Sequence, residues 1–121
     1  MNNRVLVVDD DPDIVENLKL VLEPEDLEVA CAPNGRVALD ILARADPLPS
    51  VILLDLMMPV MDGFQFRKAQ LADARIASVP VIVLTADGHV SAKTAQLGAA
   101  AGLGKPFDID ELMSLVGRVI G

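Results

Sequence analysis

Three uninterrupted runs of apolar residues limit the possible folds more than any other feature of this sequence. Each run has four residues, most of them β-branched, at positions 5–8, 51–54 and 81–84. A strand with one wet face alternates apolar and polar residues, whereas a continuous apolar run is typical of a strand covered on both faces. We therefore expect a parallel sheet with helices packed against both of its faces.

Two amphipathic helical patterns with recognisable starts accompany these runs. Asp11 followed by Pro12 has the form of an N-cap with proline at the first helical position, and apolar residues recur behind it at positions 14, 18, 21 and 22. Asp108 with Glu111 three residues later resembles a capping box, and a second apolar stripe follows at positions 109, 112, 113, 116, 119 and 120. Both patterns predict helices that cover the sheet.

Weaker patterns fill the gaps between these elements. They predict strands at 27–32 and 101–105 and helices at 36–44, 64–73 and 89–97, so strands and helices alternate along the chain. Such alternation predicts a three-layer, doubly wound (βα)5 sandwich of the flavodoxin-like kind, an α/β fold with a five-stranded parallel sheet in the order 2-1-3-4-5. We expect residues 1–121 to form a single domain.

Composition excludes several classes of protein. The chain is 52% apolar and 23% charged, which is globular and not disordered, and its 10 basic and 18 acidic residues give a net charge of −8. The basic residues are scattered, so direct nucleic-acid binding is not expected. The apolar runs are too short to cross a membrane and no signal-peptide pattern is present. With one cysteine, Cys31, and one histidine, His89, neither an internal disulfide nor a Cys/His zinc site can form, and a reducing, cytoplasmic setting is expected.

Polar residues stand where the predicted strands end. Asp9, Asp55 and Thr85 follow the three apolar runs, Asp10 comes directly after Asp9, and Lys105 closes the fifth strand. Ligands of open α/β sheets bind beyond these carboxyl ends. Two carboxylates about 4 Å apart repel by about 4 kcal/mol at an effective dielectric near 20, so a cluster of three requires a cation. Oxygen ligands with room for water favour Mg²⁺.

A divalent ion beside a carboxylate, a hydroxyl and an ammonium is suited to phosphoryl transfer, where positioning and charge neutralisation supply most of the catalysis. Asp55 is then the candidate nucleophile, and Asp9 and Asp10 are the candidate metal ligands. Lys105 would pair with the carboxylate or with the phosphoryl oxygens, and Thr85 would donate a hydrogen bond to a phosphoryl oxygen.

Four segments of the chain, in this order, resemble the receiver domain of two-component response regulators. They are Val-Val-Asp-Asp-Asp at 7–11, Leu-Asp-Leu-Met-Met-Pro-Val-Met-Asp-Gly at 54–63, Leu-Thr-Ala at 84–86 and Lys-Pro-Phe at 105–107. The resemblance covers essentially the whole chain. It implies a stoichiometric phosphoacceptor that assists its own phosphorylation and dephosphorylation, not an enzyme that turns over a substrate.

The resemblance also assigns roles to single residues. It implies that Asp55 accepts a phosphoryl group from a phosphohistidine on a sensor histidine kinase or a histidine phosphotransfer protein. Mg²⁺ would be bound by Asp9 or Asp10, by Asp55 and by the main-chain carbonyl of Met57. The donor would dock over the first helix and the loop after Lys105. The sequence does not identify the output partner.

One position departs from the family pattern. Three residues before the lysine such domains usually carry Tyr, Phe or His as a rotamer switch, and this chain has Gly102. We expect the phosphorylation signal to run through residues 87–91 instead, where Asp87 would border the attacking water. An alternative of another class is a receiver-like interaction module that works without phosphorylation, although a scaffold has no physical need for the charge cluster.

Enzymatic alternatives fit the sequence less well. The glycine-rich segment 98–105 has its first glycine one residue too far from the lysine for a P-loop, and Pro106 replaces Ser or Thr. A haloacid dehalogenase-like phosphatase requires a second aspartate where this chain has Met57.

Other residues near the motifs are expected to be structural. Asp11 is expected to be an N-cap and Asp62 a turn residue before Gly63. Cys31 is expected to pack in the second strand and His89 to face solvent, and packing is favoured over partner binding for the methionines at 57, 58 and 61.

Overall fold

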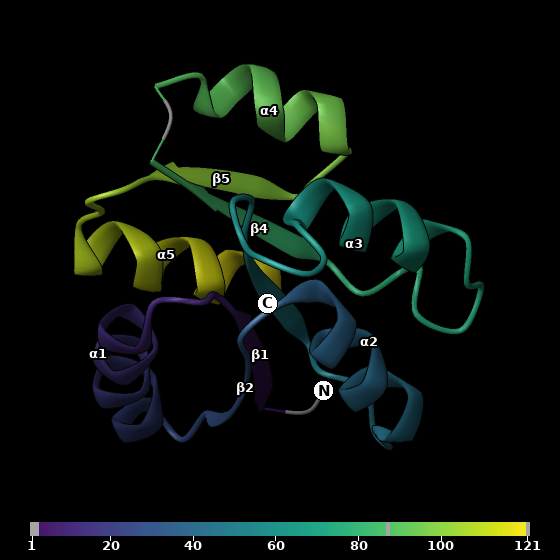
Figure 1. Cartoon of the computed structure of the whole chain (residues 1–121). Coiled ribbons are helices and arrows are strands. Elements are labelled where there is room, and N and C mark those ends of the chain that lie inside the picture. The colour runs from purple at the N-terminus through teal and green to yellow at the C-terminus, as the bar shows by residue number, and fades with distance from the viewer. Residues whose placement is uncertain (1–2, 87, 121) are drawn as a thin grey trace.

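The computed structural model describes residues 3–86 and 88–120 and confirms the alternation of strands and helices (Figure 1). The strands are β1 (Arg4–Val8), β2 (Glu28–Ala32), β3 (Val51–Asp55), β4 (Val81–Thr85) and β5 (Ala101–Gly104). The helices are α1 (Pro12–Leu22), α2 (Gly35–Arg44), α3 (Gly63–Leu71), α4 (Val90–Leu97) and α5 (Ile109–Ile120), with a short 3₁₀ helix, η1 (Glu23–Glu25), after α1. None of the helices described is long and apolar enough to cross a membrane.

The five strands form one parallel sheet in the order β2-β1-β3-β4-β5, as the flavodoxin-like fold class predicts. The three apolar runs of the sequence form the three central strands, as predicted. Every residue of β3 and β4 is buried, as are the last four of β1, whereas the edge strands β2 and β5 are partly exposed. The central strands therefore have no wet face.

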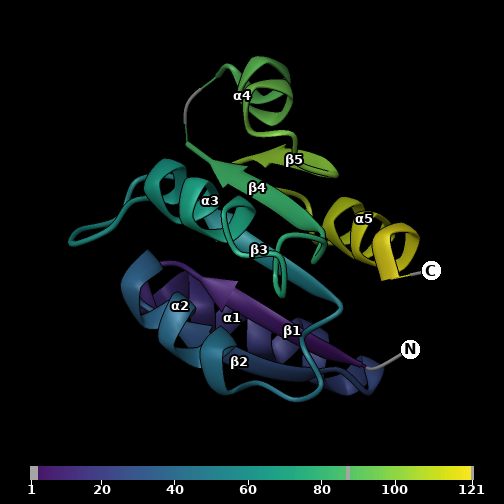
Figure 2. The same ribbon diagram turned by 90° about the vertical axis from the view of Figure 1, so that its right-hand side faces the viewer.

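Helices cover both faces of the sheet and give the molecule three layers (Figures 1 and 2). Helices α1 and α5 lie on one face, where Leu18 and Leu112 join a core cluster with the side chains of Val5 and Leu53. Helices α2, α3 and α4 lie on the other face, around a second cluster that includes Phe66. Each central strand alternates its side chains between these two clusters, which explains its unbroken apolar sequence.

Side-chain caps fix where several helices begin. Asp11 precedes α1 and accepts a hydrogen bond from the Asp13 backbone at 2.9 Å, and Asp108 accepts one from the Asp110 backbone at 2.8 Å. Both predicted N-caps are thus confirmed. Asp62, expected to be a turn residue, also caps a helix, because it forms a reciprocal capping box with Gln65 at the start of α3.

A buried arginine ties α3 to the end of α4. Arg67 is 8% exposed, and its Nε and Nη2 donate to the carbonyls of Leu97 and Gly98, both at 2.9 Å. Its Nη1 donates to Gln70 Oε1 at 2.7 Å. Burial lowers the pKa of Arg67, and among the described residues no carboxylate forms an ion pair with it. The negative end of the α4 dipole therefore supplies much of the compensation for this charge.

Helix α4 rests directly on the backbone of β5 through Val90 and Thr94. An ideal Cβ built on Gly102 would lie 2.1 Å from Thr94 Oγ1 and 3.0 Å from Val90 Cγ1. Thr94 Oγ1 is held in place because it donates to the Val90 carbonyl at 2.7 Å. Even a methyl group at position 102 would require Thr94 to move, so an aromatic ring there is sterically incompatible with the present packing of α4 on β5.

Replacing Arg67 should weaken the fold strongly. We expect Arg67→Met to lower the free energy of unfolding by about 2–4 kcal/mol, because the two carbonyls at the end of α4 and the Gln70 amide oxygen lose their donors. Urea unfolding measures this loss. Arg75→Met is the matched control, since Arg75 also donates to carbonyls at a helix end, those of Leu42 and Ala45, but is exposed, so water can replace it. Equal losses in the two variants would contradict the role assigned to Arg67.

The contact between α4 and β5 predicts a coupled pair of substitutions. Gly102→Ala should cost about 1–3 kcal/mol of unfolding free energy, because Thr94 must move, and Thr94→Ala in the same chain should recover part of that loss. Gly117→Ala is the control, because a Cβ on Gly117 meets nothing within 4 Å and should instead stabilise α5 by about 0.5–1 kcal/mol. Strictly additive effects at 102 and 94 in urea unfolding would refute the contact.

Candidate functional site

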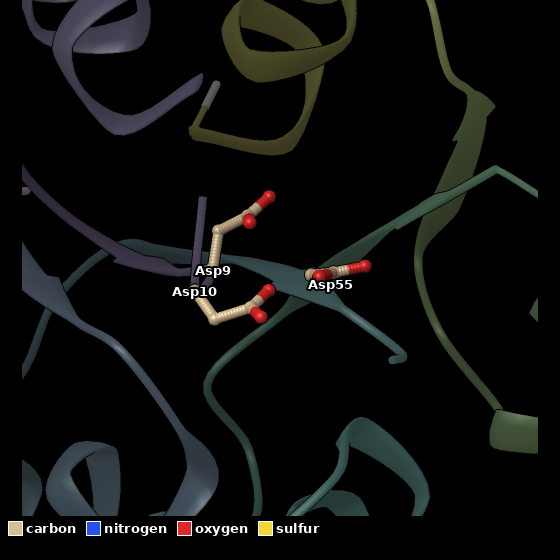
Figure 3. A group of neighbouring side chains, drawn as sticks. All are labelled: Asp9, Asp10 and Asp55. Carbon is tan, nitrogen blue, oxygen red and sulfur yellow. The ribbon is translucent and has the colours of Figure 1, made fainter. Parts of the chain in front are cut away.

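The carboxyl ends of β1 and β3 bring three acidic side chains together (Figure 3). Asp9 follows the last residue of β1, Asp10 comes next in the turn before α1, and Asp55 ends β3. One carboxylate oxygen from each lies within 4.8 Å of the others. Asp9 and Asp55 are buried, at 2% and 6% exposure, whereas Asp10 is exposed. The predicted acidic cluster is therefore present and open to solvent on one side.

Lys105 lies against the two buried carboxylates. Its Nζ is 2.8 Å from Asp9 Oδ2 and 3.4 Å from Asp55 Oδ1, and its side chain is only 15% exposed. The backbone amide of Lys105 donates to the carbonyl of Thr85 at 2.7 Å, which fixes the lysine beside the end of β4. Three carboxylates face one ammonium, so the cluster keeps an excess of negative charge.

Burial and like charge raise the pKa of Asp55. Desolvation is the largest cause and the charge of Asp9 the next, while Lys105 and a hydrogen bond from the Met57 backbone oppose the rise. Desolvation acts to lower the pKa of Lys105, but its hydrogen bond to Asp9 and the charges of Asp9 and Asp55 raise it on balance. The lysine is therefore held as a cation, whereas the negative charge of ionised Asp55 is not fully offset by its surroundings.

Backbone groups hold the carboxylates in position. The Asp11 amide donates to Asp9 Oδ1 at 2.9 Å and the Met57 amide to Asp55 Oδ1 at 3.4 Å. Gly63 begins α3 so close to β3 that a Cβ on it would lie 2.5 Å from the Asp55 carbonyl oxygen. The glycine after Asp62 is thus required by the close approach of α3 to the residue at the centre of the cluster.

The remaining predicted site residues are placed less directly. Thr85 ends β4 with 1% exposure, one residue beyond Leu84, which pairs with Asp55 in the sheet. Met57 follows two residues after Asp55, and its side chain is 72% exposed. The expectation that Met57 packs is therefore wrong, because the loop leaves β3 with this side chain pointing to solvent. Asp87 lies outside the described residues.

The other expectations for nearby residues agree with the structure. Met58 and Met61 pack against the core on the α2 and α3 face, and Cys31 packs partly buried against the opposite core. Burial raises the pKa of the Cys31 thiol. His89 is exposed at the residue before α4.

Sequence reasoning missed Val60, in the loop between β3 and α3. Its φ of 68° lies in the left-handed region, and its side chain is 81% exposed. A β-branched residue in this region is an outlier, and the left-handed conformation costs an L-residue about 1–2 kcal/mol. Only a glycine or asparagine at position 60 would have indicated this backbone from the sequence, so no signal was available.

The donor set of the cluster suits a hard divalent cation. Asp9, Asp10 and Asp55 offer only carboxylate oxygens, two of them on buried residues, and the single nearby ammonium leaves negative charge to be neutralised. Mg²⁺ prefers such oxygen ligands and keeps part of its water shell, which the exposed side at Asp10 can accommodate. The chemistry of these residues therefore fits the predicted metal.

The parallel sheet has this strand order, and acidic residues and a lysine gather at its carboxyl edge. Comparison with known proteins identifies the class of signalling domain that has these features. Residues 5–117 match the family model of the response regulator receiver domain. The chain belongs to this family and is a receiver domain of the two-component type.

Individual relatives agree with this assignment. Response regulator Rre1 of Synechocystis sp. is 40% identical over 119 residues, which cover 96% of this chain and 51% of the relative. Sporulation initiation phosphotransferase F of Bacillus subtilis is 35% identical, over 99% of this chain and 95% of the relative. The crystal structure of a putative response regulator from Chloroflexus aurantiacus superposes on this chain with a TM-score of 0.88 at 34% sequence identity. The superposition covers 99% of this chain and 98% of the chain in that crystal structure.

The chain is shorter than several curated relatives that it matches. It spans between 25% and 51% of the length of the first four, although it covers nearly all of the sporulation phosphotransferase.

The raised pKa of Asp55 predicts how stability depends on pH. The folded state binds the Asp55 proton more tightly than the unfolded state, so ionisation of this group lowers stability as the pH rises from its unfolded pKa, near 4, through the higher folded value. We expect Asp55→Asn to be more stable than the wild type at pH 7 in the presence of a chelator, with a gain that shrinks toward pH 4. Thermal unfolding across this range measures it.

Asp40→Asn is the matched control for this prediction. Asp40 is exposed on α2, 3.9 Å from Arg36, and should show no such gain. A gain for Asp55→Asn that does not change with pH would contradict the electrostatic explanation.

Proposed function

We propose that this receiver domain is a Mg²⁺-dependent phosphoacceptor, in which Asp55 takes a phosphoryl group from a phosphohistidine on a sensor histidine kinase or a histidine phosphotransfer protein. The observation that carries the proposal is the position of Asp55, buried at the end of β3 against Lys105, with Asp9 and Asp10 beside it. We further propose that residues 1–121 form a single domain, which the match over residues 5–117 supports.

The proposed transfer forms one bond and breaks one. A carboxylate oxygen of Asp55 attacks the phosphorus, the P–N bond to the donor histidine breaks, and the imidazole leaves with the electron pair of that bond. The product is an acyl phosphate on Asp55. Such a transfer needs little covalent help from the protein, because positioning and charge neutralisation supply most of the rate.

Three groups of this chain serve that step. Lys105, already 3.4 Å from Asp55 Oδ1, neutralises charge on the attacking carboxylate and on the phosphoryl oxygens. Thr85, at the end of the neighbouring strand, donates its hydroxyl hydrogen to a phosphoryl oxygen. The turn at Asp9 and Asp10 keeps two further carboxylates beside the reacting one.

The residues that would hold Mg²⁺ are Asp9, Asp10, Asp55 and the main-chain carbonyl of Met57. When bound, the ion supplies positive charge that offsets the repulsion between the carboxylates and the incoming phosphoryl group. The match to a protein named a sporulation initiation phosphotransferase, over nearly its whole length, supports a phosphoryl-transfer role.

We propose that the signal leaves the site through the segment that joins β4 to α4, without an aromatic switch. The packing of Thr94 and Val90 on Gly102 leaves no space for a ring. The C-terminal end of α4 is anchored by Arg67. The N-terminal end of α4 follows the end of β4 most closely along the chain, so it is the end that a shift of Thr85 would move.

The test of the phosphoacceptor role is intact mass after incubation with acetyl phosphate. We expect one phosphoryl adduct on the wild type, dependent on Mg²⁺, and none on Asp55→Asn. Lys105→Met should slow adduct formation at least tenfold, because the attacking carboxylate loses its neutralising partner. Asp40→Asn, whose carboxylate is exposed on α2, is the matched control and should form the adduct at the wild-type rate.

Two outcomes would change the conclusion. An adduct that persists in Asp55→Asn would place the acceptor elsewhere. No adduct, in a folded wild type that binds Mg²⁺, would favour a receiver-like interaction module that works without phosphorylation.

A further inference from the structure

The fold holds the backbone at Val60, because the Met61 amide donates to the Pro59 carbonyl at 2.7 Å, but no packing contact among the described residues requires a valine there. Its side chain belongs to neither core cluster and is 81% exposed, while its backbone, at a φ of 68°, is one that glycine or asparagine adopts at less expense. A strained residue persists where the surroundings or a function require it, and such residues gather at binding sites and switches. The strain at Val60 thus points to a contact made outside this chain.

Val60 has an exposed apolar neighbour in the same loop. Met57 is 72% exposed, and Pro59 between them is exposed as well. The loop leaves the sheet directly after Asp55, so these side chains lie on the carboxyl edge from which any donor must reach the buried carboxylate. We call residues 57, 59 and 60 the loop patch.

The charges around the loop patch indicate which kind of partner the patch can bind. The turns after β1, β3 and β5 on this edge carry the carboxylates of Asp10, Asp11, Asp62 and Asp108, which lie at or near the surface. A phosphorylated donor is itself anionic and is repelled by this acidic rim. The uncharged loop patch offers it apolar contact area beside Asp55, and such contacts supply affinity without charge.

Resting on the proposed phosphoacceptor function, we propose that Val60, together with Met57, is a specificity-determining contact for the phosphohistidine donor protein, retained despite the backbone strain that it imposes. The occupant of the loop patch is the protein surface around the donor histidine. A small acyl phosphate, which has no such surface, does not use the patch.

The strain is tested by three substitutions at position 60. Val60→Gly and Val60→Asn should each raise the midpoint of thermal unfolding by about 4 °C, because both residues accept the left-handed backbone. Val60→Thr is the matched control, since it stays β-branched and should give no increase. If neither glycine nor asparagine raises the midpoint, position 60 is not strained and the proposal fails.

The contact is tested by the ratio of two phosphorylation rates, one with a protein donor and one with acetyl phosphate. Candidate protein donors are the autophosphorylated histidine kinase cores and phosphotransfer proteins from the genome that encodes this chain. The donor used is the one that labels the wild type fastest. We expect Val60→Gly and Val60→Asn to lower the ratio about tenfold, as the loss of one buried valine side chain predicts. Leu71→Ser, which changes an exposed apolar residue at the far end of α3, should leave the ratio unchanged.

The outcomes separate this proposal from the function on which it rests. Without an adduct from acetyl phosphate, the phosphoacceptor function itself fails. If acetyl phosphate labels Asp55 but no phosphohistidine protein of that genome does, or if the ratio is the same in Val60→Gly and the wild type, the donor is not the occupant of the loop patch. Self-association that is lost in Val60→Gly would assign the patch to a second copy of this chain and would also overturn the proposal.

Discussion

Burial of the central strands on both faces is the constraint on which the rest of this structure depends. Because β1, β3 and β4 have no wet face, polar side chains are tolerated only where these strands end. The parallel arrangement places those ends along one edge of the sheet, so Asp9, Asp55 and Thr85, far apart in the sequence, become neighbours. The same arrangement that excludes polar groups from the core therefore concentrates them at a single site.

Several interactions at the site destabilise the folded chain when nothing is bound to it. Asp55 is buried against Asp9, with one lysine to offset the repulsion, and Val60 is held in a left-handed backbone a few residues further on. Elsewhere the fold satisfies its polar groups closely, and Arg67 is bonded through all three of its nitrogen atoms. Unfavourable energy is thus concentrated in the β3–α3 region, where a bound cation, a phosphoryl group or a partner can relieve it.

The parts of the fold that could be predicted are those with a local cause. The apolar runs predicted the strands, and the aspartates at 11 and 108 predicted helix starts, because the chemistry acts within a few residues. Arg67 gave no such signal, since an arginine in a helix is ordinarily expected at the surface and its acceptors lie about thirty residues away. Met57 and Val60 were missed because exposure and a left-handed φ depend on how the loop leaves the sheet. Their positions at the ends of predicted strands identified Asp9, Asp10 and Asp55 as a cluster, and the motif resemblance assigned their roles. The structure showed how closely Lys105 approaches them.

The close contact of Thr94 with Gly102 also limits how this chain could diverge. A lineage that acquired a larger residue at 102 while keeping Thr94 would first have to pass through a badly packed intermediate. The permissive order is a smaller residue at 94, or a relocated α4, before any side chain appears at position 102. These two positions should therefore covary among descendants of this sequence, and the glycine is historically contingent on the helix that lies over it.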